Sequence, residues 1–347
     1  MPVDRRRTGV LLIQLGTPSS PAVSDVRRYL RQFLADRRVL DMPRLPHWLL
    51  LHLVILPFRP RKSAAAYASI WTREGSPLLL HSRGLAEAVA GQLGDGFVVE
   101  LGMRYGEPSL EEALARLAQA DLERLVGLPL FPQHADSSTG SALAHFLELA
   151  SGTWHGSELS TIGAFYDHPA YLASVAALAR APLREFRPDH LLFSYHGLPE
   201  RQIRKSDASG SFCLSSDSCC AAIGAANRDC YRAQCFATTR SLAAALELET
   251  EQHSISFQSR LGRIPWIRPY TDDVLPELAS GGIRRLAVIC PSFVADCLET
   301  LEEIEIRARQ QWIEAGGEDF LLIPSLNSEP VWAEAVARMI REHLQHQ

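Results

Sequence analysis

The chain has 347 residues, of which 46% are hydrophobic and 22% charged, the composition of a globular protein long enough for two domains with separate cores. Its formal net charge of −5 argues against nucleic acid as a partner. The longest apolar run, residues 48–58, is interrupted by His52 and Pro57 and is too short to cross a bilayer, so we expect a cytoplasmic protein.

Short apolar runs alternate with helical segments along the whole chain. We expect strands at residues 9–15, 97–103, 125–130, 159–165, 190–195, 254–257, 286–290 and 320–323. This alternation predicts an α/β fold with mainly parallel sheets. Because the two halves repeat the rhythm, we expect two similar domains with an interdomain cleft. The first would cover residues 1–165, and the second residues 166–347, ending in a helix at 330–344.

Residues 43–60 form an apolar segment with prolines at both ends and basic residues around it. Such a segment has two interpretations. It is either a buried helix or an interfacial segment that dips into a membrane surface. The sequence does not separate the two.

Residues 205–235 break the alternating pattern, because they are polar and rich in serine. Five of the seven cysteines fall here: Cys213, Cys219, Cys220, Cys230 and Cys235. In a reducing compartment, such clustering indicates a metal site rather than a disulfide framework. A structural Zn2+ site and free thiols are the alternatives.

Three carboxylates follow the strand expected at 286–290. Glu299 and Glu303 are four residues apart and share one helix face, and Asp296 adds a third carboxylate nearby. They form either a solvated acidic face or an acidic track at the carboxyl end of a strand, where open α/β sheets place their ligands. Such a track could carry protons or a hard divalent cation.

His196 directly follows the strand expected at 190–195, and the next three residues, Gly-Leu-Pro, predict a turn. A neutral imidazole at this point could accept a proton or bind a metal, or it could be a structural histidine that caps the strand. The sequence contains no Walker loop, no G-x-G-x-x-G and no H-E-x-x-H motif. The absence of a G-x-S-x-G elbow weakens a hydrolase interpretation.

Several motifs together resemble one family. They are LIQLGTP (12–18), Tyr67 with GSP (75–77), MRY (103–105), LFPQ (130–133) with STGS (138–141), FSYHGLP (193–199), FQSRLG (257–262), PYTD (269–272) and CPSFVADCLETLEE (290–303). In this order, from about residue 8 to 340, they resemble the ferrochelatase family, most closely the protoporphyrin-type enzymes of Gram-negative bacteria.

The resemblance implies insertion of Fe2+ into protoporphyrin IX to give protohaem, with release of two protons, in the terminal step of haem biosynthesis. The implied fold is two Rossmann-like, chelatase-type domains. His196 matches the family's base or metal-handling residue, Glu299 the acidic residue opposite it, and Glu303 and Asp296 the acidic track behind. Fe2+, the substrate, would meet His196 and Glu299.

Further residues match positions at the porphyrin. The apolar ones are Leu15, Trp266 and Phe293, and the polar ones, near the ring or its propionates, are Tyr67, Ser76 and Arg104. Residues 43–60 match the lip over the pocket. Eukaryotic members usually carry His where this chain has Cys297, which leaves a metal-relay role there unsupported.

The cysteine-rich insertion resembles an internal iron–sulfur cluster of some bacterial members. A 2Fe–2S cluster needs four thiolates, so one of five cysteines is spare. Neighbouring side chains of an extended backbone point apart, so we expect only one of Cys219 and Cys220 to bind, preferably Cys220. The expected ligands are Cys213, Cys220, Cys230 and Cys235, with Cys219 as the alternative and Cys235 the less secure fourth. No cysteine follows Cys297, so no C-terminal cluster is expected.

Two other functions compete with this interpretation. One is a related chelatase for another tetrapyrrole or for cobalt, which the apolar lip disfavours. The other is a non-catalytic haem-binding or iron–sulfur scaffold, which the presence of both His196 and Glu299 disfavours. The expected partners are protoporphyrin IX and Fe2+, with peripheral contact to the inner membrane as an open alternative. A monomer and a homodimer both stay open.

Overall fold

The computed structural model describes residues 7–262 and 264–346, and the chain divides into two compact units. The first comprises Met1–Phe131, Ala135–Ala164 and Asn327–Gln347, and the second Pro132–His134 and Phe165–Leu326. The closing helix α12 (Pro330–Gln345) thus belongs to the first unit, where it packs on α4 (Pro77–Leu93). The domain boundaries expected from the sequence assigned this helix to the second domain. Those boundaries stay a prediction.

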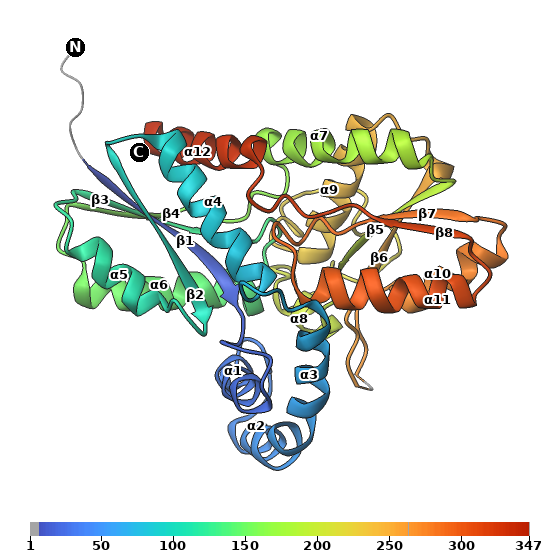
Figure 1. The fold of residues 1–347 in the computed structure, drawn as a ribbon, viewed down its shortest axis with the longest axis horizontal. Helices are drawn as coiled ribbons and strands as arrows, with labels where there is room; N and C mark the ends of the chain where they lie inside the picture. Colours follow the sequence, from blue (N-terminus) through green and yellow to red (C-terminus); the bar gives the residue numbers. More distant parts are fainter. Residues whose placement is uncertain (1–6, 263, 347) are drawn as a thin grey trace. The chain divides into compact units, whose positions relative to one another are not determined.

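The first unit is built on a four-stranded, wholly parallel sheet in the order β2-β1-β3-β4. Its strands are β1 (Thr8–Gly16), β2 (Phe97–Tyr105), β3 (Arg124–Pro129) and β4 (Glu158–Thr161). Helices α4 and α12 lie on one side of this sheet, and α5 (Leu110–Ala118) and α6 (Ser141–Thr153) on the other (Figure 1). Leu110 and Phe146 are fully buried in the core between α5, α6 and the sheet.

The second unit has a sheet of the same kind in the order β6-β5-β7-β8. Its strands are β5 (His190–His196), β6 (His253–Gln258), β7 (Arg285–Ile289) and β8 (Asp319–Leu322). One side carries α7 (Pro169–Phe186) and α9 (Tyr231–Ala245), and the other α10 (Thr271–Ser280) and α11 (Arg309–Glu314) (Figure 1). The remaining short helices are α8 (Glu200–Lys205) and η3 (Thr250–Gln252).

The two sheets have the same topology, which confirms the expected α/β fold of two similar domains. In each, the chain runs from the first strand to a neighbour on one side and then crosses to the neighbour on the other side. The first strand of each unit, β1 or β5, is therefore a topological switch point. Open α/β sheets bind ligands beyond the carboxyl ends of such strands. Leu15 lies at the end of β1 and His196 at the end of β5.

Two glycines let the backbone approach closely at these switch points. Gly16 has a φ of 120°, and a Cβ built on it would lie 1.7 Å from the carbonyl oxygen of Tyr105. A Cβ on Gly197 would lie 2.7 Å from the carbonyl oxygen of Gln258. Only glycine fits such sites without moving the neighbouring strand.

Residues 43–60 are neither one helix nor buried. They span α2 (Arg44–Leu49), the π-helix η1 (Leu50–Ile55) and the start of α3 (Leu56–Ile70), and α3 packs on α1 (Val23–Ala35). Leu51 is 3% exposed and anchors the segment, but Leu53 is 58% and Phe58 76% exposed. Trp48, Leu49 and Val54 are exposed as well. The buried-helix interpretation is therefore wrong.

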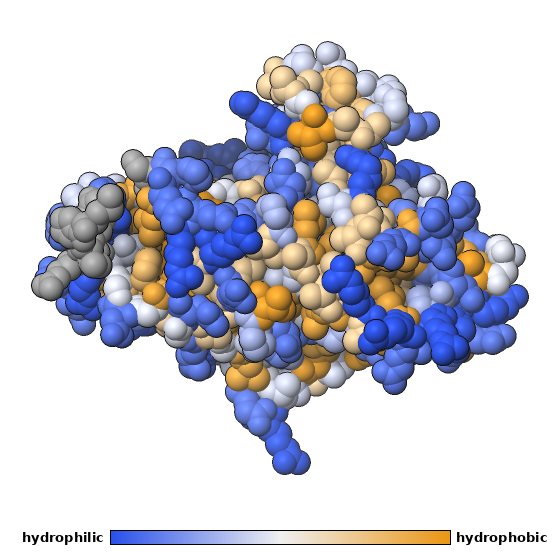
Figure 2. Space-filling view, turned by 90° about the horizontal axis from the view of Figure 1, so that it is seen from above, coloured by the Kyte–Doolittle hydropathy of each residue, from blue (hydrophilic) through white to orange (hydrophobic). Residues whose placement is uncertain are grey.

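Most of the face shown in Figure 2 is hydrophilic, and hydrophobic residues appear there in smaller groups. Within residues 7–262 and 264–346, no helix combines the length and the apolarity that a membrane span requires.

Candidate active site

His196 is held by its own turn in one tautomer. Its Nδ1 lies 2.6 Å from the carbonyl oxygen of Gly197. A carbonyl oxygen only accepts, so Nδ1 donates, and in the neutral ring Nε2 keeps the lone pair. The backbone is fixed too, because the His196 N–H donates to Ser292 Oγ at 3.2 Å and the Tyr231 hydroxyl donates to the His196 carbonyl at 2.9 Å.

Two aromatic rings flank this imidazole. The ring centroids of Trp266 and Phe293 lie 6.5 Å and 6.3 Å from that of His196. Trp266 is fixed by donating its indole N–H to the Leu261 carbonyl at 2.9 Å. The structure thus brings three of the expected site residues together around one basic nitrogen in an apolar setting.

The acidic residues lie on and before η4 (Leu298–Ala308), which follows β7, the neighbour of β5. We expected an α-helix here, but the segment is a π-helix, a form that recurs at functional sites. Glu303 is fixed at its carboxylate, which accepts from Ser259 N at 2.7 Å and Ser259 Oγ at 2.5 Å. Ser259 has a φ of 67°, in the left-handed region that non-glycine residues rarely adopt.

Asp296 and Glu299 differ in their surroundings. Asp296 is buried and accepts from Thr300 Oγ1 at 3.0 Å and from the Ser325 N–H at 3.2 Å. Glu299 is half-buried, and its backbone carbonyl accepts from Gln258 Nε2 at 2.8 Å. Burial, and then the charge of Glu299, keep the pKa of the Cys297 thiol well above its usual range. Cys297 is therefore a neutral thiol, a poor metal ligand at neutral pH.

The expected site residues of the first unit gather at the carboxyl end of its sheet. Leu15 is half-buried at the end of β1. Ser76, which precedes α4, accepts from Thr17 Oγ1 at 2.9 Å. Tyr67 is buried, with its ring edge-on to those of Tyr29 and Trp71.

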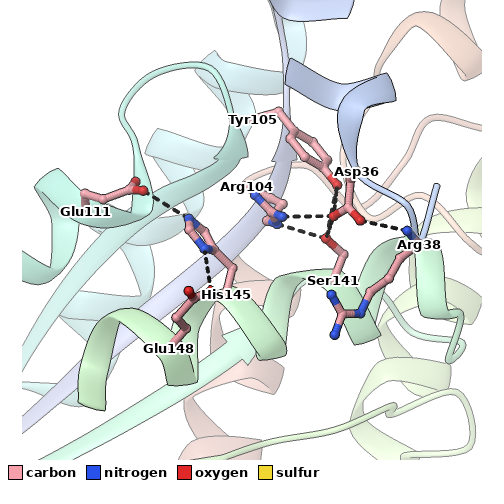
Figure 3. A network of polar contacts seen from close by, with 8 residues as sticks. All are labelled: Asp36, Arg38, Arg104, Tyr105, Glu111, Ser141, His145 and Glu148. Atoms are coloured by element: carbon pink, nitrogen blue, oxygen red, sulfur yellow. Dashed lines mark hydrogen bonds and ion pairs between the residues drawn. The ribbon is translucent and has the colours of Figure 1, made fainter. Parts of the chain in front are cut away.

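Arg104 belongs to a buried polar network centred on Asp36, which directly follows α1 (Figure 3). Asp36 Oδ2 accepts from Arg104 Nη2 and from the Tyr105 hydroxyl, both at 2.9 Å, and from Ser141 Oγ at 2.5 Å. Arg104 also donates from Nε to Ser141 Oγ at 2.8 Å. Burial raises the pKa of Asp36, but the hydrogen bonds from Ser141, the Arg38 N–H and Tyr105, together with Arg104, outweigh it, so the pKa is lowered. The carboxylate is therefore ionised at neutral pH.

Sequence analysis missed Asp36 and Ser259. Both lie in loops just beyond regular elements, and neither belongs to a pattern that singles out a partner. Asp36 could have been suspected only as an acidic residue at a helix end, where a carboxylate is not favoured by the helix dipole.

The insertion folds around two polar side chains. Asp207 Oδ2 accepts from the N–H groups of Phe212 and Cys213, each at 2.7 Å. The hydrogen bond from Cys213, followed by one from Ser209, lowers the pKa of Asp207 to about 2, so these bonds hold at neutral pH. Asn227 Nδ2 donates to the carbonyls of Cys219 and Ala222 at 2.9 Å and 2.8 Å.

Four thiols form a connected group in this insertion. The sulfurs of Cys219 and Cys220 lie 3.7 Å apart, and the Cys230 thiol interacts with those of Cys213 and Cys220. Cys219 and Cys220 lie in a turn rather than an extended strand, so the argument that they must point apart is wrong. Cys235 lies within α9, fully buried, where its thiol interacts with Tyr231.

The donor set is compatible with a dinuclear cluster. Among the described residues, no three His, Cys, Asp or Glu side chains are arranged to hold one metal ion. A structural Zn2+ site needs four ligands around one ion, whereas a 2Fe–2S cluster needs four thiolates shared between two irons. The buried thiols of the insertion are donors of the type that both requirements name.

Comparison with known proteins identifies the family. A family model described as Ferrochelatase matches residues 7–344. The chain is 51% identical over 342 residues to a ferrochelatase of Coxiella burnetii (strain Dugway 5J108-111), covering 99% of this chain and 95% of that protein. This chain belongs to the ferrochelatase family. It is also 47% identical over 336 residues to a ferrochelatase of Legionella pneumophila (strain Philadelphia 1), covering 97% of this chain and 99% of the relative.

Solved chelatases share the ferrochelatase fold of this chain. SirB from Bacillus subtilis with Fe3+ superposes with a TM-score of 0.54 at 11% identity, covering 97% of this chain and 95% of that one. The sirohydrochlorin chelatase SirB of subspecies spizizenii, in complex with cobalt, also has a TM-score of 0.54, at 9% identity, covering 97% and 94% of the two chains. At these identities the likeness concerns the fold. The expected family, chelatase-type fold and metal-inserting enzyme class are confirmed.

Proposed function

We propose that this chain inserts Fe2+ into protoporphyrin IX to form protohaem, the terminal step of haem biosynthesis. Fe2+ binds the four pyrrole nitrogens as two N–H bonds break, so two protons must leave. The observation that carries the proposal is the imidazole of His196, whose Nδ1–H is occupied by Gly197 and whose Nε2 is left as a base. A positioned base of this kind contributes about a hundredfold to ten-thousandfold to a rate.

The carboxylates give the released protons a route away from the ring. We assign Glu299 to the position nearest the reaction, with Glu303 and Asp296 as the track behind it. Glu303 is preorganised by Ser259, so it need not reorient to receive a proton or a cation. Fe2+ is a hard enough cation for these oxygens and also binds imidazole nitrogen.

In each unit, we assign apolar or polar groups at the carboxyl end of the sheet to porphyrin binding. Phe293 and Trp266 flank the base, and Leu15 lies at the matching end of β1. Holding the macrocycle bent would expose its pyrrole nitrogens, which is a form of ground-state strain. Tyr67, Ser76 and Arg104 supply polar contacts to the ring or its carboxylates.

An anaerobic turnover assay with Fe2+ tests this function. We expect protoporphyrin IX to be metallated faster than coproporphyrin, because the two additional carboxylates of coproporphyrin must be desolvated against apolar side chains. Formation of the Soret band of the metallated product measures both rates. Binding of porphyrin without metallation would show a haem-binding scaffold instead, and faster turnover of coproporphyrin would overturn the choice of substrate.

The exposed apolar segment supports peripheral membrane contact by a cytoplasmic enzyme. Trp48, Leu49, Leu53, Val54 and Phe58 are all more than 40% exposed on consecutive helices. A cluster of this kind on a helical surface binds weakly and reversibly at a lipid interface. The porphyrin substrate and the haem product both have a large apolar macrocycle, so such contact would shorten their path through water.

Replacing Leu53 and Phe58 by glutamate should reduce binding to anionic liposomes about a hundredfold or more, since each side chain loses roughly 1.5–3 kcal/mol of burial in lipid. Thermal stability should hardly change, because both side chains are exposed in the protein. Ile313→Glu, at a residue that is 48% exposed on α11, is the matched control and should bind liposomes like the parent. Co-flotation with liposomes measures binding, and an unchanged double variant would contradict membrane contact.

The insertion would hold a 2Fe–2S cluster through Cys213, Cys220, Cys230 and one further cysteine. The contact between the sulfurs of Cys219 and Cys220 favours Cys219 over the Cys235 expected from the sequence. Such a cluster supplies one-electron redox chemistry and takes no part in removing pyrrole protons. We assign it a role in supporting the fold of the insertion or in sensing iron or oxidants.

A further inference from the structure

The carboxylate of Asp36 accepts four hydrogen bonds. Its side chain is 8% exposed and receives three side-chain donors on Oδ2, while Oδ1 accepts from the Arg38 N–H at 2.7 Å. These donors come from β2 and from the start of α6, two elements that end or begin at the carboxyl edge of the first sheet (Figure 3). The network therefore fixes side chains at the edge where a ligand binds.

Arg104 is the side chain whose orientation this network fixes most fully. Its guanidinium donates from Nε to Ser141 and from Nη2 to Asp36, and its carbon Cζ lies 4.5 Å from the centre of the Tyr105 ring. For Nη1, no hydrogen-bond partner occurs among residues 7–262 and 264–346. The side chain is still 15% exposed. One edge of the guanidinium is thus clamped, and another is available to an acceptor from outside the protein.

An arginine clamped in this way is suited to an anionic ligand group. Guanidinium groups recognise carboxylates through directed N–H donors, and a fixed guanidinium loses less side-chain entropy on binding. The ligand that the proposed function supplies is a porphyrin with two propionate carboxylates. The hydroxyls of Tyr105 and Ser141 are both engaged with Asp36, so Arg104 is the buried donor of this network with a group to spare.

We propose that Asp36 is a positioning residue that orients Arg104 to recognise a carboxylate of the porphyrin. This inference rests on the proposed function and deepens it. Asp36 does not touch the substrate. It acts by holding Nη2, so that Nη1 points to one place, and by keeping Ser141 in position to accept from Nε.

Asp36→Asn separates this role from simple packing. The amide keeps the shape, but only one of its two ends accepts. Either the NH2 group faces Arg104, Tyr105 and Ser141, or it faces the Arg38 N–H, and in both orientations donors oppose donors. In the first orientation Arg104 loses its acceptor, and in the second it keeps only a neutral one, so the variant weakens the hold on Arg104 with almost no change in volume.

The test compares steady-state metallation of protoporphyrin IX with that of its dimethyl ester. For Asp36→Asn we expect KM for the free acid to rise about tenfold, the worth of one charge-assisted hydrogen bond, with kcat within about twofold of the parent. The KM for the ester, which has no carboxylate to recognise, should stay the same. Asp36→Glu should restore part of the difference between acid and ester.

Two further variants keep the result interpretable. Glu111→Gln removes the carboxylate that lies 3.0 Å from His145 Nε2, outside the network, and should leave both KM values unchanged (Figure 3). If Asp36→Asn does not fold, Ser141→Ala decides, with an expected rise in KM of about threefold for the acid alone. Equal changes for acid and ester, or a loss of kcat at constant KM, would overturn the inference. If the parent protein metallates neither porphyrin, the proposed function has failed instead.

Discussion

His196→Ala should abolish metallation while porphyrin binding survives. The variant removes Nε2, the nitrogen that is left as an acceptor because Nδ1 donates to the Gly197 carbonyl. Loss of a positioned base costs about a hundredfold to ten-thousandfold in rate. Binding should persist, because apolar groups such as Trp266 and Phe293 remain. Single-turnover metallation measures the chemical step, and quenching of porphyrin fluorescence measures binding.

Two glutamate variants of η4 accompany His196→Ala: the first tests a proposed catalytic carboxylate, and the second is its control. Glu299→Gln removes charge but little volume and should slow turnover strongly at unchanged binding. Glu305→Gln, whose carboxylate pairs instead with Arg309, should turn over like the parent. A near-parental rate for His196→Ala would show that another group takes the protons. Equal effects of the two glutamate variants would show that only the net charge of the helix matters.

Cys219→Ser should lose the visible absorption of the cluster, whereas Cys235→Ser should keep it. Cys219 lies 3.7 Å from Cys220, sulfur to sulfur, in the same turn of the insertion. Cys235 lies on α9 with its thiol interacting with Tyr231 as well as Cys220, and we propose that it packs in the core rather than binding iron. Removing one of four thiolates leaves an iron with an open position, so the cluster is lost or becomes labile.

The measurement is made on protein purified anaerobically from iron-replete cells. Visible absorption and a paramagnetic signal after reduction report the cluster. Loss of both signals in Cys235→Ser, with Cys219→Ser intact, would restore the ligand set expected from the sequence. A colourless parent protein that contains zinc, or no metal, would exclude the cluster altogether.

Strands such as β1, β5 and β7 could be predicted because their burial is nearly complete. The strand expected at 190–195 is β5 (His190–His196) in the structure, and the strand expected at 286–290 is β7 (Arg285–Ile289). Strands of a parallel sheet are covered on both faces, so they read as continuous apolar runs rather than as alternating patterns. Once the strands are known, the residues that follow them are known too, and this is why His196 could be singled out.

The polar contacts that complete the site could not be predicted in the same way. Asp36 meets Arg104 across 68 positions of sequence, and Ser259 meets Glu303 across 44. Such pairs form only when the loops bring two distant residues together. A local sequence pattern does not show which residues a loop brings together. The π-helical winding of η4 was missed for a related reason, since an apolar stripe with a spacing of three or four residues does not distinguish it from an α-helix.

The way the insertion closes on itself has an evolutionary consequence. Asp207 and Asn227 satisfy backbone groups of Phe212, Cys213, Cys219 and Ala222 with bonds that begin and end inside the segment. A segment of this kind behaves as a cassette, because the strands on either side do not depend on it for their own pairing. Lengthening a connection costs little, about 0.6 kcal/mol for each doubling of a flexible loop. Ancestral proteins could therefore have acquired or discarded this cassette, with its thiols, while the metal-inserting core stayed under separate selection.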